Sequence, residues 1–260
     1  MKQKILIIGG DSKIAACLIS LFRKKKEGYF LTTRRKNKIN RTSIFLDLLN
    51  VKKFIIPKNI QTAIILAGID GEKNCENQFK NAKKINYYSL PFLIKKLIKK
   101  KIFVIYISSM SIYNRNSLHG NLRLLAEQRI LDRLSAHDKK LISIIRPTKI
   151  VNLNNSIIKW YDYKKNNGHF ENFFQPLLFS RTANFIFNVA KKKYNKIYNL
   201  IGKKKIFFFR RKSKHFQKLK KYIINKKIRY KNNFKIAKPN LIKIIENKEI
   251  KEFLFRNTNE

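Results

Sequence analysis

The sequence predicts an α/β protein in which helices cover both faces of a mostly parallel, doubly wound sheet. Short apolar strands alternate with amphipathic helices through the first 150 residues. This alternation is typical of parallel sheets, because each strand must cross over through a helix to reach the next. The first strand, Ile5 to Ile8, is an unbroken run of apolar residues, and such a run fits a strand that is buried on both faces.

The elements of this first part follow one another in a regular order. Six strands are expected, at residues 5–8, 29–33, 43–47, 62–68, 101–107 and 141–145. The first helix begins directly after two glycines and has an apolar face made of Ile14, Cys17, Leu18, Leu21 and Phe22. A second helix is expected at about residues 86–100, and a third carries Leu122, Leu125, Ala126, Ile130 and Leu134 on one face.

The alternation loosens beyond residue 150. A short strand is expected at residues 175–179, a helix at 181–193, a strand at 197–202 and a last helix after Pro239. The sequence therefore predicts two units. Residues 1–150 form the main α/β domain, and residues 151–260 form a small basic lobe, some segments of which return to the sheet.

The turn after the first strand has the features needed to hold a pyrophosphate. Glycines let phosphates approach the backbone, and a helix N-terminus presents unpaired N–H groups with a positive dipole end. The spacing is Gly9-x-x-Ser12-x-x-Ala15, so serine and alanine stand where a dinucleotide-binding turn has its second and third glycines. An ordinary strand–helix connection is the alternative interpretation of this turn.

The end of the second strand predicts which dinucleotide would bind. An acid at this place binds the adenosine ribose, whereas an arginine accommodates the 2′-phosphate of NADP. The strand ends in Thr33, Arg34 and Arg35, with no acid, so NADP is the expected cofactor and NAD the alternative. The competing interpretation places both arginines in a basic surface loop.

The composition excludes several classes of protein. No apolar run reaches the roughly 18 residues of a membrane helix, and the apolar run near the start is too short for a signal peptide. Cys17 and Cys75 have neither a metal-binding spacing nor the pattern of a disulfide framework, so no metal is expected. These features are typical of a cytoplasmic protein.

The formal net charge of +45 assigns no function by itself. It would attract phosphates, nucleic acids or anionic membranes. However, the lysines are spread along the chain with many Ile, Asn, Phe and Tyr residues, as a codon pool rich in A and T would produce. A nucleic-acid-binding role would depend on residues 203–237, whose aromatic side chains could stack on bases: Phe207, Phe208, Phe209, Tyr222 and Tyr230. The hydrophobic face of a C-terminal lobe is the simpler interpretation of these aromatics.

Six motifs occur in a specific order along the chain. They are Gly9-Gly-Asp-Ser-Lys-Ile-Ala15, Leu66-Ala-Gly68, Ile107-Ser-Ser-x-Ser-Ile-Tyr113, Ala126-Glu-Gln128, Ile145-Arg-Pro147 and Tyr198-Asn-Leu200. The series resembles the NAD-dependent epimerase/dehydratase family, which is the extended branch of the short-chain dehydrogenases/reductases. The resemblance covers about residues 3–202. It implies a Rossmann-type NAD(P)-binding domain followed by a small lobe whose substrate is commonly a nucleotide-sugar.

The resemblance also implies cofactor contacts, position by position. The glycine turn would hold the pyrophosphate. The Asp-Leu pair after the third strand would contact the adenine, and the backbone of the Ala-Gly pair after the fourth would run alongside the ribose and nicotinamide end of the cofactor. The expected cofactor-binding residues are Gly9, Gly10, Ser12, Lys13, Ile14, Thr33, Arg34, Arg35, Asp47, Leu48, Ala67 and Gly68.

The catalytic pair of the resembled family is altered in this chain. That family uses Tyr-x-x-x-Lys, and registration on Ala126-Glu-Gln128 places His119 and Arg123 at these positions. Histidine can exchange protons near neutral pH, whereas arginine keeps its charge. Ser109 stands at the family's active-site Ser/Thr position, and Tyr113 is a further candidate acid. The expected catalytic residues are thus Ser109, Tyr113, His119 and Arg123.

Three functions remain open from the sequence. The leading hypothesis is a NAD(P)-dependent epimerase, dehydratase or reductase that acts on a nucleotide-sugar in glycan biosynthesis, with homodimer formation as an option. The second is a dinucleotide-binding sensor or assembly protein without turnover, which the altered catalytic pair supports. The third, least favoured, is nucleic-acid binding.

Overall fold

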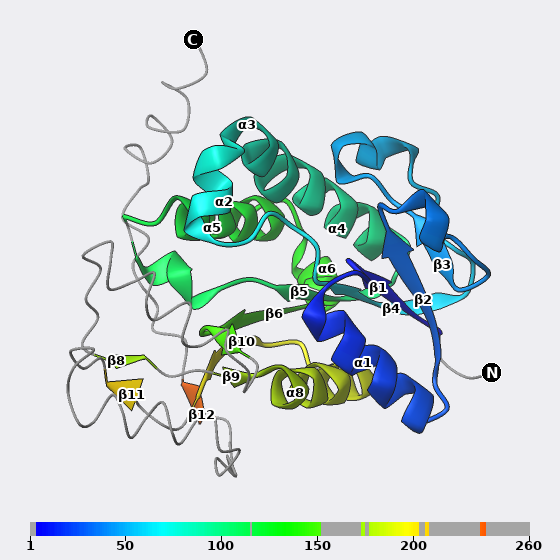
Figure 1. The fold of residues 1–260 in the computed structure, drawn as a ribbon. Helices are drawn as coiled ribbons and strands as arrows, with labels where there is room; N and C mark the ends of the chain where they lie inside the picture. Colours follow the sequence, from blue (N-terminus) through cyan, green and yellow to red (C-terminus); the bar gives the residue numbers. More distant parts are fainter. Residues whose placement is uncertain are drawn as a thin grey trace.

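The computed structural model describes residues 4–114, 116–151, 173–174, 177–202, 206–207 and 235–237. Its centre is an eight-stranded sheet with the order β12-β10-β6-β5-β4-β1-β2-β3 (Figure 1). Seven neighbouring strands are parallel, and β12 pairs antiparallel with β10 at one edge. The predicted α/β class with a doubly wound parallel sheet is confirmed.

Seven strands of this sheet lie close to their predicted positions, and the eighth, β12, was not predicted from the sequence. The eight strands are β1 (Lys4–Ile8), β2 (Gly28–Thr33), β3 (Ser43–Phe45), β4 (Ile60–Ile65), β5 (Phe103–Ile107), β6 (Ile142–Pro147), β10 (Ile197–Ile201) and β12 (Lys235–Ala237). Two small pairs lie outside it. One joins β7 (Ile150–Val151) to β9 (Leu177–Leu178), and the other joins β8 (Phe173–Phe174) to β11 (Ile206–Phe207).

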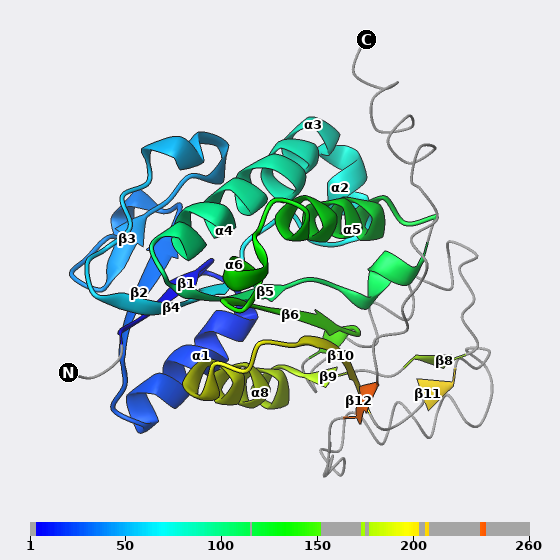
Figure 2. The ribbon, with the colours of Figure 1, turned by 180° about the vertical axis from the view of Figure 1, so that it is seen from behind.

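Helices cover both faces of the sheet, as the two opposite views show (Figures 1 and 2). One face carries α1 (Lys13–Lys24) and α8 (Phe179–Lys192). The other carries α2 (Glu72–Asn77), α3 (Phe79–Ala82), the π-helical segment η3 (Lys83–Ser89), α4 (Leu90–Lys99) and α5 (Leu118–Leu131). Shorter elements connect them: η1 (Lys36–Lys38), η2 (Leu48–Lys53), η4 (Met110–Tyr113) and α6 (Ala136–Lys139).

The central strand β1 contributes to both apolar layers. Ile5 and Ile7 pack with the side chains of α1 and α8, while Leu6 and Ile8 pack on the α4 and α5 side. All four side chains are fully buried. The prediction of a strand that is buried on both faces is therefore confirmed.

The strand order reverses beside β1, because β2 and β4 flank it on opposite sides. In open α/β sheets this reversal opens a crevice at the carboxyl ends of the strands, where ligands bind. The glycine turn follows β1 at this place, and the Ala67–Gly68 loop follows β4. The topology thus sets the position of the candidate site.

Two sequence-based boundaries need correction. The helix predicted at about residues 86–100 is preceded by helical turns that begin at Glu72. The apolar pattern misses these turns because they bury small side chains such as Cys75 and Ala82. In addition, β9 forms part of the strand predicted at 175–179, and α8 begins at Phe179, two residues before the predicted start of its helix. The helix predicted after Pro239, and most of the basic stretch at 203–237, lie outside the described residues.

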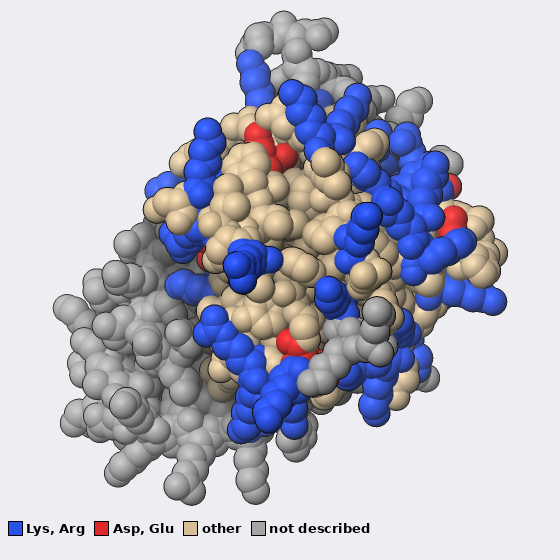
Figure 3. Space-filling view, turned by 90° about the vertical axis from the view of Figure 1, so that its right-hand side faces the viewer, with Lys and Arg blue, Asp and Glu red and all other residues tan. Residues whose placement is uncertain are grey.

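Positive charge dominates the surface drawn in Figure 3, where Lys and Arg side chains are numerous and acidic ones are few. This agrees with the composition of 60 Lys and Arg against 15 Asp and Glu. Of the helices that the structure describes, none combines the length and apolarity required to cross a bilayer.

Candidate active site

The glycine turn has a backbone shape that other residues could not adopt without strain. Gly9 has a φ of +95°, and a Cβ atom there would lie 2.7 Å from the backbone nitrogen of Ala67. Gly10 donates its N–H to the carbonyl of Thr32 at 2.9 Å. The turn therefore packs directly against the loop after β4 and the end of β2. These are the three segments that a bound dinucleotide would follow.

Ser12 fits the place of a glycine because its backbone does not need glycine's freedom. Its φ is −79°, and its hydroxyl accepts a hydrogen bond from the N–H of Ala15 at 3.1 Å, which makes it the N-cap of α1. The N–H groups of Lys13 and Ile14 in the first turn have no carbonyl four residues earlier within the helix. They face the start of α1 together with its positive dipole end. The turn thus fits a pyrophosphate.

A carboxylate lies at the end of β2, although the strand itself contains none. Thr33 donates its hydroxyl to Asp11 Oδ2 at 2.7 Å, and Lys38 Nζ lies 3.5 Å from the other oxygen. Partial burial opposes ionisation, yet the Thr33 hydrogen bond and the charges of Lys38 and Arg35 give a net lowering of the Asp11 pKa. Sequence reasoning missed Asp11, because it comes from the glycine turn and reaches β2 only in space. Arg34 and Arg35 are exposed beside it.

The residues expected at the adenine end have clear local roles. Asp47 is the N-cap of η2, where it accepts hydrogen bonds from the N–H of Leu49 at 2.9 Å and from Asn50 Nδ2 at 2.7 Å. Leu48 is buried. The pair is therefore held rigidly at the carboxyl end of β3, within the same edge of the sheet as the glycine turn.

The loop after β4 joins the cofactor turn to α5. A Cβ atom at Gly68, whose φ is +148°, would lie 2.8 Å from Arg123 Nη2 and 2.9 Å from Asn86 Oδ1. Asn86 is fully buried and holds the loop by accepting from the N–H of Ile69 at 3.0 Å and donating to its carbonyl at 2.8 Å. The backbone of Gly68 and the guanidinium of Arg123 therefore lie in contact.

His119 and Arg123 lie one turn apart on α5, and both are buried, with 5% and 4% of their surface exposed. Arg123 donates from Nη1 to the Tyr106 hydroxyl at 3.3 Å and to the carbonyl of Ile107 at 3.4 Å. Burial alone would lower its pKa, but its interactions with the Tyr106 hydroxyl and with Asp70 outweigh this effect, and the net pKa is raised. Arg123 thus remains a fixed cation at the carboxyl end of β5.

His119 is paired with an acid that the sequence did not single out. Its Nε2 lies 3.0 Å from Asp70 Oδ1 and 3.4 Å from Arg123 Nε. One ring nitrogen cannot donate to the carboxylate and accept from the guanidinium at once. We assign the shorter contact as the hydrogen bond, so that Nε2–H donates to Asp70. The lone pair then resides on Nδ1, which is the ring atom able to accept a proton.

Two acids after β4 thus organise the start of α5. Glu72 accepts hydrogen bonds from the Ser117 hydroxyl and from the N–H groups of Leu118 and His119, while Asp70 holds the imidazole. The Asp70 side chain is 79% exposed, and the hydrogen bond from His119 lowers the pKa of its carboxyl. The available sequence signal was the position of both acids directly after a strand, at the carboxyl edge of the sheet.

The Asp70→Asn variant is expected to lose less stability in acid than the native protein. A carboxyl whose pKa is lowered by folding contributes stability above its ordinary value near pH 4, and this contribution is lost as the pH falls towards the lowered pKa. The free energy of unfolding, measured in urea at about pH 7 and about pH 3, checks this. Asp132→Asn is the control, and an equal acid dependence in the native protein and Asp70→Asn would contradict the prediction.

Ser109 and Tyr113 are not joined to His119 or Arg123 by any hydrogen bond in the described part of the chain. Ser109 caps η4 through the N–H of Ser111 at 3.1 Å and donates to the Ser111 hydroxyl at 3.0 Å. The Tyr113 hydroxyl accepts from Arg146 Nη1 at 2.9 Å and lies 2.9 Å from Asn199 Nδ2. Both side chains therefore have structural partners.

Arg146 belongs to the same network. It makes a bidentate ion pair with the buried Glu127, so its guanidinium has a structural partner. The hydroxyl of Ser108, in contrast, is buried and has no hydrogen-bond partner within the described residues. It lies directly after β5, beside Ser109, and sequence reasoning gave it no role.

The fold defines a Rossmann-type α/β protein, and the glycine turn lies at the crevice where proteins of this fold bind ligands. No protein-family model matches the chain, and none of the curated proteins matches it by sequence. Its structure does match solved enzymes of the extended short-chain dehydrogenase/reductase class at low sequence identity. The resemblance predicted from the ordered motifs is thus confirmed at the level of the fold.

Three solved structures illustrate this similarity. A hypothetical dTDP-4-dehydrorhamnose reductase from Sulfolobus tokodaii has a TM-score of 0.62 at 19% identity, over 80% of this chain and 79% of that one. A dTDP-4-dehydrorhamnose reductase from Bacillus anthracis in complex with NADP has a TM-score of 0.66 at 13% identity, over 91% and 83%. The protein MoeE5 in complex with UDP-glucose and NAD has a TM-score of 0.59 at 17% identity, over 79% and 78%.

Proposed function

We propose that this protein is a NAD(P)-dependent enzyme that acts on a nucleotide-sugar in glycan biosynthesis, with His119 and Arg123 in place of the usual tyrosine and lysine. The observation that carries the proposal is a continuous line of contacts. It runs from Gly9 to Ala67, along the loop to Gly68, and from there to Arg123 and His119. The turn that fits a pyrophosphate is thereby connected to the altered catalytic positions.

Each part of this line has a proposed role. The N–H groups at the start of α1 hold the pyrophosphate, and Asp47 with Leu48 borders the adenine. Arg123 holds the loop at Gly68 in place, and this loop borders the nicotinamide end of the cofactor. The bound cofactor would supply or accept a hydride, as its nicotinamide does in other enzymes. His119, oriented by Asp70, transfers the accompanying proton, and Ser109 positions the reacting oxygen.

The substrate class rests on similarity to the solved structures. Two of the three are named for a nucleotide-sugar substrate, and the third contains UDP-glucose. We place the substrate at the carboxyl edge of the sheet, beside the cofactor turn, because ligands of open α/β sheets bind at this edge.

Titration with NADPH and NADH at moderately high salt tests the proposal. Saturable binding of either cofactor, followed by turnover with one member of a panel of nucleotide-sugars, is the expected result. Binding of neither cofactor would overturn it.

A dinucleotide-binding protein without turnover is the second candidate. The observation that favours it is the burial of His119 and Arg123, which leaves little of either side chain open to a substrate. Saturable cofactor binding without turnover across the substrate panel would select this function.

The Asp11→Asn variant is expected to prefer NADPH over NADH about tenfold more strongly than the native protein. The Asp11 carboxylate shares the end of β2 with Arg35 and Lys38, so it repels a 2′-phosphate and can accept the ribose hydroxyls of NAD. Binding titrations with both cofactors measure the ratio. The control is Asp132→Asn, which removes one negative charge at the end of α5, and an equal change in both variants would contradict the prediction.

A further inference from the structure

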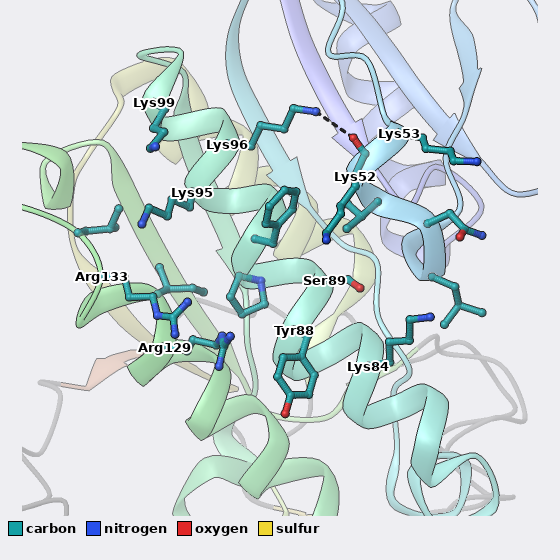
Figure 4. A pocket seen from close by; sticks show the side chains of 17 residues that line it. Lys52, Lys53, Lys84, Tyr88, Ser89, Lys95, Lys96, Lys99, Arg129 and Arg133 are labelled. Carbon is teal, nitrogen blue, oxygen red and sulfur yellow. Dashed lines mark hydrogen bonds between the residues drawn. The ribbon is translucent and has the colours of Figure 1, made fainter.

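A cavity lies away from the glycine turn, on the outer side of α4. Its volume is about 980 Å³, and it is bordered by η2, the end of η3, α4 and the last turn of α5. None of the residues assigned to the cofactor lines it. Figure 4 shows Lys52 and Lys53 on one side, Arg129 and Arg133 on the other, and the residues of α4 between them. We call this cavity the α4 groove.

The α4 groove is lined by eight Lys and Arg residues and by no Asp or Glu. None of the eight forms an ion pair within the described part of the chain. Lys96 is the most firmly held, since it donates to the carbonyl of Phe54 at 2.7 Å and so ties the end of η2 to α4. A surface with this charge is electrostatically complementary to an acidic partner.

The floor of the groove is apolar. Val51, Ile130 and Leu134 are buried beneath it, whereas Phe92 and Tyr88 are 43% and 37% exposed. Arg129 stacks over the Tyr88 ring with its guanidinium carbon 4.9 Å from the ring centre. Exposed aromatic residues and arginine are enriched at protein interfaces, and a large side chain left exposed in a groove offers a docking point.

The shape of the groove selects the form of the partner. The floor follows α4, which has 10 residues and is therefore about 15 Å long. Cations flank this floor on both sides (Figure 4). A helix with apolar residues on one face and carboxylates along its flanks matches both features, as in other complexes in which a helix lies in a groove.

The same observations disfavour two other occupants. Single-stranded nucleic acid gains its binding energy from exposed aromatic faces. Here most of the floor is aliphatic, and Arg129 already covers one face of Tyr88. A second copy of this chain would bring the same cations to the interface, where like charges in contact cost several kcal/mol.

We propose that the α4 groove binds an acidic, amphipathic helix of another protein. This function is independent of the proposed enzymatic activity, because the groove and the glycine turn share no residues. The partner's apolar residues contact Phe92 and Tyr88, and its carboxylates pair with Lys52 and Lys53 on one side and with Arg129 and Arg133 on the other.

A model peptide tests the proposal on the full chain. The probe is a fluorescent peptide of about 15 residues with leucines at helical spacing and glutamates on the flanks. A second peptide has the same composition in scrambled order. Fluorescence anisotropy at about 0.15 M and about 0.5 M salt is expected to show saturable binding of the amphipathic peptide, at least about tenfold tighter than the scrambled one.

Three variants separate the groove from the general charge of the protein. Lys95→Glu with Arg133→Glu is expected to weaken binding at least about tenfold, and Phe92→Ser to weaken it by a similar factor that persists at high salt. Lys139→Glu with Lys140→Glu makes the same change in charge at exposed sites beside α6 and is expected to alter binding less than about twofold.

Several results would overturn the proposal. One is equal binding of the two peptides, and another is an equal loss of affinity in the groove and control charge variants. A third is tighter binding of single-stranded oligothymidylate that is lost with Phe92→Ser, since this would assign the groove to nucleic acid. The last is a dimer in sedimentation that Lys95→Glu with Arg133→Glu dissociates, which would assign it to a second copy.

Discussion

The His119→Phe variant is expected to lose turnover by a factor of about 10² to 10⁴ while it binds NADPH with nearly native affinity. Phenylalanine retains a ring of similar size in the buried site but has no nitrogen that can carry a proton. Asp70 Oδ1, 3.0 Å from Nε2, loses its donor but remains exposed to water, so the fold is expected to persist. Steady-state kinetics and cofactor titration together measure the two quantities.

Two further variants make this result specific. His137→Phe carries the same substitution at an exposed position of α6 and is expected to leave turnover unchanged. Asp70→Asn removes only the group that orients His119, so a smaller loss of kcat with an altered pH profile is expected. Native turnover in His119→Phe would show that another group carries the proton.

The Gly120→Ala variant is expected to destabilise the protein by about 3 kcal/mol. A Cβ atom at this position would lie 2.0 Å from the carbonyl oxygen of Ser111 and 2.6 Å from its carbonyl carbon. Both are backbone atoms, so α5 and η4 would have to separate. Helix propensity alone favours alanine over glycine by about 1 kcal/mol, and the prediction is therefore opposite in sign to what the helix by itself would give.

Urea unfolding with a fixed slope measures the expected change in the free energy of unfolding. Gln128→Ala, a partly exposed position two turns further along α5, is the control and is expected to change stability by less than about 0.5 kcal/mol. A similarly small effect of Gly120→Ala would show that α5 does not pack on η4 in solution as the structure describes.

Local sequence patterns predicted the sheet and the pyrophosphate turn because both depend on short-range features. The apolar run Ile5–Ile8 indicates a strand that is buried on both faces, and Gly9 indicates a turn that needs a positive φ. The partners of the site residues depend on contacts between distant segments. Asp11 meets Thr33 across 22 positions, and no periodicity in either segment encodes this contact.

The altered catalytic pair shows the same limit. The sequence placed His119 and Arg123 one turn apart on a helix, and α5 has them there. Their burial and the pairing of His119 with Asp70 follow from the packing of the loop after β4 on α5, which side-chain types alone do not specify. The ion pair of Arg146 with Glu127 joins two segments in the same way, and no local pattern predicts it.

The packing of α8 and β10 determines which parts of the protein unfold together. Ala183, Ile186 and Val189 of α8 complete the apolar layer over Ile5 and Ile105, and β10 pairs with β6. A chain that stopped at residue 150 would leave this layer open to water and one side of β6 unpaired. We therefore expect residues 4–151 and 177–202 to unfold cooperatively as a single unit. Hydrogen exchange should then give the amides of β6 and β10 the same free energy of opening.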